Sequence, residues 1–340
     1  MRIILAGLGV VGKSLVRLLH ERSDELFKEY SIRPRIVAIS DLSGSAIDTK
    51  GLDLKRVLDV KEKSGSISGY NKEVASLDTN ELIEKTEAEV FVDATPTNVK
   101  DGEPGMTYLK HAMKFHKNVI SVNKGPLALA LPALTELAEL NHIKLRFSGT
   151  VGGGTPMLEF GKRCLEGDHI VSIRGILNGT TNFMLTQMEE QGLSFDNALN
   201  LAKKKGYAEA EPSLDVDGID AAAKLVIMAN LVMGKKVTMK NVEVQGIRRV
   251  TPHDFVKAAK KGSTIRLIAS VSDKLVVKPT EISIHDPLAV SGVLNAVTFT
   301  SKFAGDLTVV GAGAGGYETA SAILRDMLDI NESLVAAARN

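Results

Sequence analysis

The sequence has almost no cysteine, no excess of charge and no long apolar run. Cys164 is the only cysteine among 340 residues, so no disulfide can form within the chain, and the seven histidines lack Cys/His metal-site spacing. The 42 basic and 41 acidic residues nearly cancel, which argues against a nucleic-acid binder or a membrane-surface protein. Neither a membrane span nor a signal-peptide pattern is present. We therefore expect a cytoplasmic protein with small-molecule partners and no nucleic-acid or membrane partner.

The first half of the chain alternates short apolar runs with helical periodicity, which predicts an α/β fold with a parallel sheet. A long amphipathic helix, broken near Ser23, is expected between the first two strands. The segment 59–70 is rich in Lys, Gly and Ser and is expected to be an exposed loop or short turn without a function. The expected strands are residues 3–6, 36–39, 90–92 and 119–122.

The second half predicts an α+β domain, and a length of 340 residues itself favours two domains. A strand over 143–147 is followed by the densest glycine stretch, 149–156, where we place the change of domain. Thr251-Pro252-His253-Asp254 supplies capping residues for a helix over 255–261. Further strands are expected at 170–176, 242–247, 264–271 and 275–277, and further helices from 181, near 195–205 and over 218–233.

A G-x-G-x-x-G motif lies between the first predicted strand and helix, which is the context in which this motif binds a dinucleotide. The first glycine allows a tight turn, the second lets backbone amides approach a pyrophosphate, and the third lets helix and strand pack closely. A glycine-rich turn without a ligand is the alternative. The motif therefore predicts a Rossmann-type doubly wound sheet that binds NAD or NADP through Gly7, Leu8, Gly9, Val10, Val11 and Gly12.

The choice between NAD and NADP stays open at the end of the second predicted strand. The carboxylate of Asp41 would favour the free ribose hydroxyl of NAD. Asp41 lies farther from the glycines than is usual, and several neighbouring polar side chains could bind the phosphate of NADP instead. These are Ser40, Ser43, Ser45, Lys55 and Arg56.

Two further candidates follow later strands of the first half. Ligands of doubly wound sheets lie outside the carboxyl ends of the strands. Thr95 ends one strand and could face the nicotinamide ribose, and Lys124 follows another. Lys124 could equally be an ordinary solvated lysine.

A run of carboxylates surrounds one lysine in the segment 206–224. If a helix starts near Gly218, Asp220 and Lys224 lie four residues apart on one face, so Asp220 can hold the ammonium as a proton donor requires. The alternative is an acidic helix cap formed by Asp217 and Asp220, with an ordinary surface ion pair of little energetic value.

That segment, together with Gly-Ile-Leu-Asn-Gly-Thr-Thr-Asn-Phe at 175–183, resembles the homoserine dehydrogenase signature. The similarity extends to the N-terminal glycines, Asn123-Lys124, residues 149–156 and the C-terminal glycines. The resemblance implies interconversion of L-aspartate 4-semialdehyde and L-homoserine with NAD or NADP, toward threonine and methionine. It also implies a dinucleotide-binding domain over 1–147, completed by 305–340, and a catalytic and dimerisation domain over 148–304 of a homodimer.

The resemblance assigns roles to residues of both halves. Lys224 would transfer the proton, Asp220 would orient it, and Lys124 would lie beside substrate and nicotinamide. Glu209 would bind the substrate ammonium, with Asp215 a secondary polar group. Thr180 and Asn178 would line the pocket, although Asn178 could serve only the backbone turn.

Two glycine-containing segments are also assigned by the resemblance. Val151 and Gly153 match positions whose backbone carbonyls hold a sodium ion in the family. Ser148 stands where a glutamate is common, and the glycines could instead form only a tight hinge. Gly315 would approach the cofactor where the chain returns to the first domain.

Two alternatives remain beside this prediction. One is another amino-acid or semialdehyde dehydrogenase on the same plan, but an acyl-enzyme mechanism needs a nucleophilic cysteine, and Cys164 lies in an amphipathic, structural stretch. Another is a cofactor-binding regulator without activity, against which Glu209, Asp220 and Lys224 argue. Because many relatives carry a regulatory or kinase domain that this sequence lacks, feedback control through such a domain is not expected.

Overall fold

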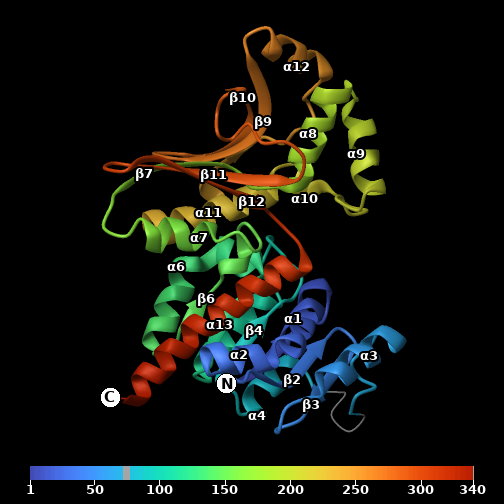
Figure 1. Ribbon diagram of the computed structural model, residues 1–340, viewed down its shortest axis with the longest axis vertical. Helices are drawn as coiled ribbons and strands as arrows, with labels where there is room; N and C mark the ends of the chain where they lie inside the picture. Colours follow the sequence, from blue (N-terminus) through green and yellow to red (C-terminus); the bar gives the residue numbers. More distant parts are fainter. Residues whose placement is uncertain (72–76, 340) are drawn as a thin grey trace. The chain divides into compact units, whose positions relative to one another are not determined.

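The computed structural model describes residues 1–71 and 77–339 (Figure 1). Its contacts divide the chain into two compact units. The first unit comprises Met1–Thr150 and Gly315–Asn340, and the second comprises Val151–Ala314. Among the described residues, no helix is both long enough and apolar enough to span a membrane.

The first unit contains a sheet in the order β3-β2-β1-β4-β5-β6. All its neighbouring strands run parallel except the edge strand β3, which pairs antiparallel with β2. The four strands expected early in the sequence are confirmed, and β3 was not expected. The strands are β1 Arg2–Ala6, β2 Arg35–Asp41, β3 Gly44–Ile47, β4 Val90–Asp93, β5 Asn118–Ser121 and β6 Leu145–Arg146.

Helices connect the parallel strands of this Rossmann-type doubly wound sheet, so the predicted fold class is confirmed. The predicted break of the first helix near Ser23 is also confirmed. The helices are α1 Val10–Glu21, α2 Ser23–Tyr30, α3 Leu54–Ser64, α4 Thr79–Lys85, α5 Gly105–Lys114, α6 Lys124–Leu140 and α13 Gly316–Arg339, with the 3-10 turn η2 at Ser148–Thr150.

The expectation of a loop over 59–70 is wrong for its first part, because α3 extends to Ser64. The part of this helix from 59 to 64 has one apolar residue, Val60, so it carries no apolar periodicity, whereas Leu54, Val57 and Leu58 at its start pack against the core. Asp53 caps its N-terminus by accepting a hydrogen bond from the Arg56 amide (3.0 Å), and Gly65 ends it in the left-handed conformation.

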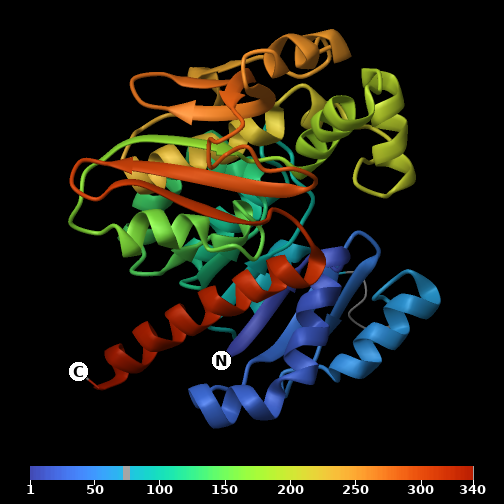
Figure 2. The same cartoon turned by 45° about the horizontal axis from the view of Figure 1, so that its top comes forward.

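The C-terminal helix α13 belongs to the core of the first unit. It packs along α1 (Figure 2), and its buried residues Ile323, Met327 and Ile330 join the cluster that contains Ile3 and Leu15. The chain therefore returns to the sheet at which it began.

The second unit contains a sheet in the order β12-β11-β7-β9-β10-β8, antiparallel except for the pair β10 and β8. β11 and β12 were not expected from the sequence. Residues 305–312 form β12 and pair with β11, so the return to the first unit comes at Gly315 rather than at 305. The strands are β7 Ile170–Ile176, β8 Val242–Val244, β9 Ser263–Val271, β10 Leu275–Ser283, β11 Leu294–Ser301 and β12 Gly305–Ala312.

The helix that positions the catalytic candidates is α11, whose residues from Ala221 to Ala229 are all buried. It packs against β7, β9 and β10. The helices of this unit are α7 Met157–Glu159, α8 Gly179–Gln191, α9 Phe195–Lys204, α10 Ser213–Val216, α11 Ile219–Met233 and α12 Pro252–Ala259, with the short turns η3 Phe160–Cys164 and η4 Met239–Asn241. The Thr251/Asp254 capping box before α12 is present as expected, and Cys164 is exposed.

Candidate active site

The glycine motif between β1 and α1 forms a tight turn that is closed on one side and open on the other. A Cβ at Gly7, which has φ +94°, would lie 2.4 Å from the Ala94 carbonyl oxygen, and one at Gly12 would lie 2.1 Å from the Gly7 carbonyl oxygen. A Cβ at Gly9 would meet nothing within 4 Å. Gly9 is the N-cap of α1 and has no side chain to cap it, so the positive end of the helix dipole faces open space where a pyrophosphate fits.

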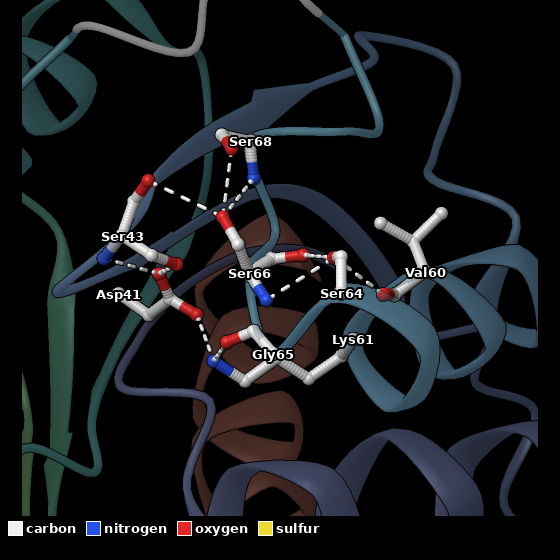
Figure 3. Close-up of polar contacts among 8 residues, drawn as sticks. All are labelled: Asp41, Ser43, Val60, Lys61, Ser64, Gly65, Ser66 and Ser68. Carbon is white, nitrogen blue, oxygen red and sulfur yellow. Dashed lines mark hydrogen bonds and ion pairs between the residues drawn. The ribbon is translucent and has the colours of Figure 1, made fainter.

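Asp41 ends β2 and is held by two groups (Figure 3). Its Oδ1 accepts hydrogen bonds from the amide and the hydroxyl of Ser43, and the amide contact is 2.8 Å long. Its Oδ2 lies 2.6 Å from the ammonium nitrogen of Lys61, a residue of α3. Lys61 also donates to the carbonyl of Gly65 at 2.7 Å. The Asp41 carboxylate is therefore paired with the Lys61 ammonium.

Serine hydroxyls extend this group beyond the ion pair. Ser66 donates to the Ser43 carbonyl (3.3 Å) and shares a 2.7 Å hydrogen bond with Ser68 (Figure 3). We name Asp41, Ser43, Lys61, Ser66 and Ser68 the β2-end cluster. Three other phosphate candidates from the sequence have side-chain partners outside this cluster. Ser40 shares a hydrogen bond with Thr79, Ser45 donates to the Leu77 carbonyl, and Arg56 donates to the Tyr70 carbonyl.

The same carboxyl edge of this sheet carries Thr95 and Lys124 after β4 and β5. Thr95 follows β4 and is bonded to Asp93, which is fully buried. Lys124 is the first residue of α6, and the Asn123 side chain caps this helix by accepting a hydrogen bond from the Gly125 amide (3.0 Å). β4 and β5 are neighbours in the sheet, so the two predicted residues follow adjacent strands.

The second unit brings Lys224 and Asp220 together as predicted from their spacing on α11. The Lys224 nitrogen lies 2.7 Å from Asp220 Oδ2 and donates to the carbonyl of Leu177 at 2.6 Å. The side chains of Lys224 and Asp220 are 9% and 14% exposed. The alternative of an ordinary surface pair does not hold, because both side chains are largely buried.

Asn178 connects this ion pair to a further carboxylate. Its amide nitrogen donates to Asp220 Oδ2 at 2.9 Å and to Asp215 Oδ1 at 2.6 Å, while its amide oxygen accepts from the Thr181 backbone amide as the N-cap of α8. Burial and the negative charge of Asp220 raise the pKa of Asp215, whereas hydrogen bonds from Asn178 and Thr180 lower it. Asn178 thus serves both the turn and the polar cluster formed by Asn178, Asp215, Asp220 and Lys224.

The sequence also predicted Thr180, Glu209, Val151 and Gly153 as site residues of the second unit. Thr180 adjoins it and donates to the carbonyl of Tyr207 at 2.8 Å. Glu209 is exposed between α9 and α10, and within the described part of the chain no hydrogen bond or ion pair joins it to the cluster. Val151 is fully buried, and Gly153 has φ +56°. In residues 1–71 and 77–339, no three His, Cys, Asp or Glu side chains are grouped to hold a metal ion.

Two polar residues near these sites were not found from the sequence. Lys61 lies in the segment to which no function was assigned. Asn295 of β11 is fully buried against Gly313, and neither of its amide atoms has a hydrogen-bond partner among the described residues. No local sequence signal marks either residue, because the contacts join elements far apart in the chain.

A pyrophosphate cradle in one unit and a held ammonium in the other are the two sites that a dinucleotide-dependent dehydrogenase requires. A family model described as "Homoserine dehydrogenase" matches residues 156–328, and one described as "Glutamate/Leucine/Phenylalanine/Valine dehydrogenase" matches residues 1–115. The chain belongs to the homoserine dehydrogenase family. It is an NAD(P)-dependent oxidoreductase that interconverts L-aspartate 4-semialdehyde and L-homoserine.

The similarity to individual members covers nearly the whole chain. The chain is 44% identical to a homoserine dehydrogenase of Methanocaldococcus jannaschii over 98% of its own length and 99% of the relative. It is 36% identical to an NAD(+)-dependent homoserine dehydrogenase of Pseudomonas canavaninivorans, covering 98% and 96% of the two chains. A crystal structure of a putative homoserine dehydrogenase from Archaeoglobus fulgidus superposes with TM-score 0.89 at 39% identity, covering 97% and 99%. A hyperthermophilic archaeal homoserine dehydrogenase in complex with NADPH has TM-score 0.86 at 30% identity, with 98% of each chain covered.

Alanine substitutions at Gly9 and Gly12 separate cofactor approach from packing. Gly9→Ala has room for its methyl group, so we expect an unchanged melting temperature and a KM for the dinucleotide raised about tenfold, because the methyl group lies where the pyrophosphate approaches. Gly12→Ala places its methyl against the Gly7 carbonyl and should lower stability by about 1–3 kcal/mol. Thermal unfolding and initial rates measure both effects. Equal melting temperatures for the two variants would refute this assignment.

Asp215→Asn should stabilise the protein while reducing its activity. The folded state binds the Asp215 proton more tightly than the unfolded state, because the pKa is raised. The Asp215 carboxyl therefore lowers the free energy of unfolding. This loss is absent below the ordinary pKa of aspartate, grows as the pH rises, and is complete above the raised pKa. We expect the variant to melt a few degrees above the parent near neutral pH, about 2–4 °C. This difference should vanish toward about pH 3, and a pH-independent or negative difference would contradict the assignment.

Proposed function

We propose that Lys224 is the group that exchanges a proton with the C4 oxygen of homoserine. One observation carries this proposal: the ammonium is held by exactly two acceptors, Asp220 and Leu177, within the described part of the chain. An ammonium has three N–H donors, so one remains for the substrate oxygen. A buried, positioned donor is what general acid catalysis requires.

The chain's own residues account for the proton, and the bound nicotinamide ring accepts or supplies the hydride. When L-homoserine is oxidised, the C4 hydroxyl loses its proton to the unprotonated amine of Lys224 as the C4 hydride departs. In the reverse direction the Lys224 ammonium returns the proton to the carbonyl oxygen of the semialdehyde. Asp220 keeps the nitrogen in place and stabilises its charged form.

The remaining polar residues would orient the substrate and the nicotinamide. Glu209 is exposed and available to pair with the substrate ammonium, and Asp215 offers a second carboxylate that Asn178 links to the ion pair. Thr180 and Asn178 would line the pocket. In the first unit, Lys124 and Thr95 would contact the nicotinamide half of the cofactor, and Gly315, with φ +146°, would let the backbone approach it.

We propose that cofactor choice is decided in the β2-end cluster. Asp41 would bind the ribose diol of NAD, and Lys61 would give the extra phosphate of NADP a cation, with hydroxyls of Ser43, Ser66 and Ser68 as donors. The Asp41–Lys61 pair therefore admits both cofactors. This proposal replaces Lys55 and Arg56 as phosphate candidates.

Two predictions from the family resemblance and one from the composition are kept as proposals. A homodimer formed through the second sheet is supported by the exposure of Leu294 on β11 and Val310 on β12, neighbouring strands of that sheet. A sodium ion bound by the carbonyls of Val151 and Gly153 is supported by the left-handed turn at Gly152 and Gly153. A cytoplasmic location is supported by the single, exposed cysteine.

Lys224→Met should lower kcat for L-homoserine oxidation by roughly 10²–10⁴-fold, which is the usual contribution of general acid–base catalysis. Binding of the dinucleotide, measured by fluorescence titration, should be unchanged. Lys261→Met is the matched control, since Lys261 is a surface lysine paired with Glu281 in the same unit. Near-normal turnover of Lys224→Met would remove this lysine from the mechanism.

Lys61→Met should shift cofactor preference toward NAD. Without the ammonium, the Asp41 carboxylate would repel the 2′-phosphate, and a loss of about 1.4 kcal/mol would reduce kcat/KM for NADP about tenfold relative to NAD. Lys63→Met on the same helix is the control, because Lys63 is exposed. An unchanged ratio of the two kcat/KM values would show that the phosphate binds elsewhere.

A further inference from the structure

One carboxylate of the first unit is buried completely at a position that no step of the mechanism uses. Asp93 is the last residue of β4 and has no exposed surface. Its Oδ1 accepts hydrogen bonds from the amide (3.0 Å) and the hydroxyl (2.6 Å) of Thr95, and its Oδ2 accepts from the hydroxyl of Ser121 (3.2 Å). Asp93 therefore ties the loop after β4 to the end of β5.

The hydrogen bonds continue from this carboxylate to the start of α6. The amide nitrogen of Asn123 donates to the hydroxyl oxygen of Thr95 at 3.0 Å and to the carbonyl of Pro96 at 3.3 Å. Its amide oxygen accepts from the Gly125 backbone at 3.0 Å. Asn123 is thus held in one orientation, and the residue that follows it is Lys124.

The direction of these bonds determines what Thr95 can offer a ligand. Asp93 Oδ1 accepts from both the amide and the hydroxyl of Thr95, so the single hydroxyl hydrogen of Thr95 points at Asp93. One lone pair of that oxygen receives Asn123, and one lone pair is left. Thr95 is partly exposed, so it presents a hydrogen-bond acceptor at the carboxyl edge of the sheet.

Burying the ionisable carboxyl of Asp93 costs free energy, which its hydrogen bonds must offset. Burial raises the pKa of its carboxyl above the ordinary value, and the hydrogen bonds from Thr95, Ser121 and Asn123 offset only part of this rise. An uncompensated buried charge costs on the order of several kcal/mol, so the Asp93 carboxyl depends on its three hydrogen-bond partners. Asp93 has no exposed surface, so it acts through those partners rather than by touching a ligand.

We propose that Asp93 is a positioning residue of the dinucleotide site: it fixes the Thr95 hydroxyl as an acceptor toward the cofactor and holds Asn123 at the start of the helix that begins with Lys124. The matching ligand group is a hydrogen-bond donor on the nicotinamide riboside half, either the carboxamide NH₂ or a ribose hydroxyl. This inference rests on the proposed function in one respect, namely that Thr95 and Lys124 face that half of the cofactor.

Asp93→Asn tests the proposal with an isosteric side chain. The asparagine NH₂ cannot accept, so it must face either the Thr95 donors on the Oδ1 side or the Ser121 hydroxyl on the Oδ2 side, and either placement weakens the network that fixes the Thr95 hydroxyl. We expect the Kd for the dinucleotide to rise about tenfold and kcat to fall, while the KM for L-homoserine stays within about twofold. The melting temperature should not fall, because a buried charge is removed. A Kd equal to that of the parent would overturn the proposal.

Glu89→Gln is the matched control at the opposite end of the same strand. Glu89 precedes β4 and its carboxylate binds the Arg2 guanidinium at 2.9 Å, so the variant removes a charged partner without touching the carboxyl edge. Its Kd for the dinucleotide should match the parent. An equal loss of affinity in both variants would show that Asp93 acts only through general strand stability.

A double-mutant cycle shows whether Asp93 works through Thr95. Thr95→Val should weaken dinucleotide binding, Thr95→Ser should retain it, and Asp93→Asn combined with Thr95→Val should be no weaker than the worse single variant by more than about twofold. Multiplicative effects would contradict the link. The Thr95 variants lie in a partly exposed loop and keep the test decisive if Asp93→Asn does not fold.

The two donor groups are distinguished with 3-acetylpyridine adenine dinucleotide, which lacks the carboxamide NH₂ but keeps both ribose hydroxyls. If the Thr95→Val effect disappears with this analogue, the donor is the carboxamide, and if it persists, the donor is a ribose hydroxyl. Binding is measured without homoserine. Absent turnover of the parent protein would therefore count against the proposed function, while the change in Kd still reports on Asp93.

Discussion

A lysine ammonium buried between one carboxylate and one backbone carbonyl is the interaction on which the catalytic unit depends. Lys224 and Asp220 can meet because α11 places them one turn apart, and Leu177 supplies the second acceptor because β7 ends beside that helix. Burying the Lys224 ammonium costs free energy. Its ion pair with Asp220, and the hydrogen bonds that both side chains make, offset this cost. Asn178 contributes to this by binding Asp220 and Asp215 at once. The members of the polar cluster are therefore linked, and a substitution at any of them is expected to alter the position of the Lys224 ammonium.

The first unit has a glycine turn whose backbone groups a large anionic ligand can approach closely. Gly7 and Gly12 are close-packed, and Gly9 is open, so the motif combines a rigid turn with one accessible side. The carboxyl edge adds polar side chains whose directions are fixed by Asp93 on one side and by Lys61 on the other. Helix α13 then completes the core from the far end of the sequence.

The features that local sequence could predict are those carried by short-range patterns. The G-x-G-x-x-G turn, the four early strands and the spacing of Asp220 and Lys224 each involve neighbours along one element. The last turns of α3 were missed because residues 59–64 include one apolar residue, Val60, so their polar composition gave no helical periodicity. Residues 305–312 were assigned to the dinucleotide-binding domain, whereas they form β12 of the second sheet. Its pairing with β11 has no signal in the local sequence. Lys61 and Asn295 could not be found because their environments arise from contacts between distant segments. The roles of the individual site residues remain predictions.

Chemical rescue of Lys224→Ala is the measurement that tests the central claim most directly. Hydride transfer would be followed by nicotinamide absorbance in a single turnover of the preformed complex with L-homoserine, with and without added methylamine. If the Lys224 nitrogen exchanges the proton, hydride transfer should be lost in the variant and should return in proportion to the concentration of unprotonated methylamine. Hydride transfer at the parent rate without any amine would contradict the account.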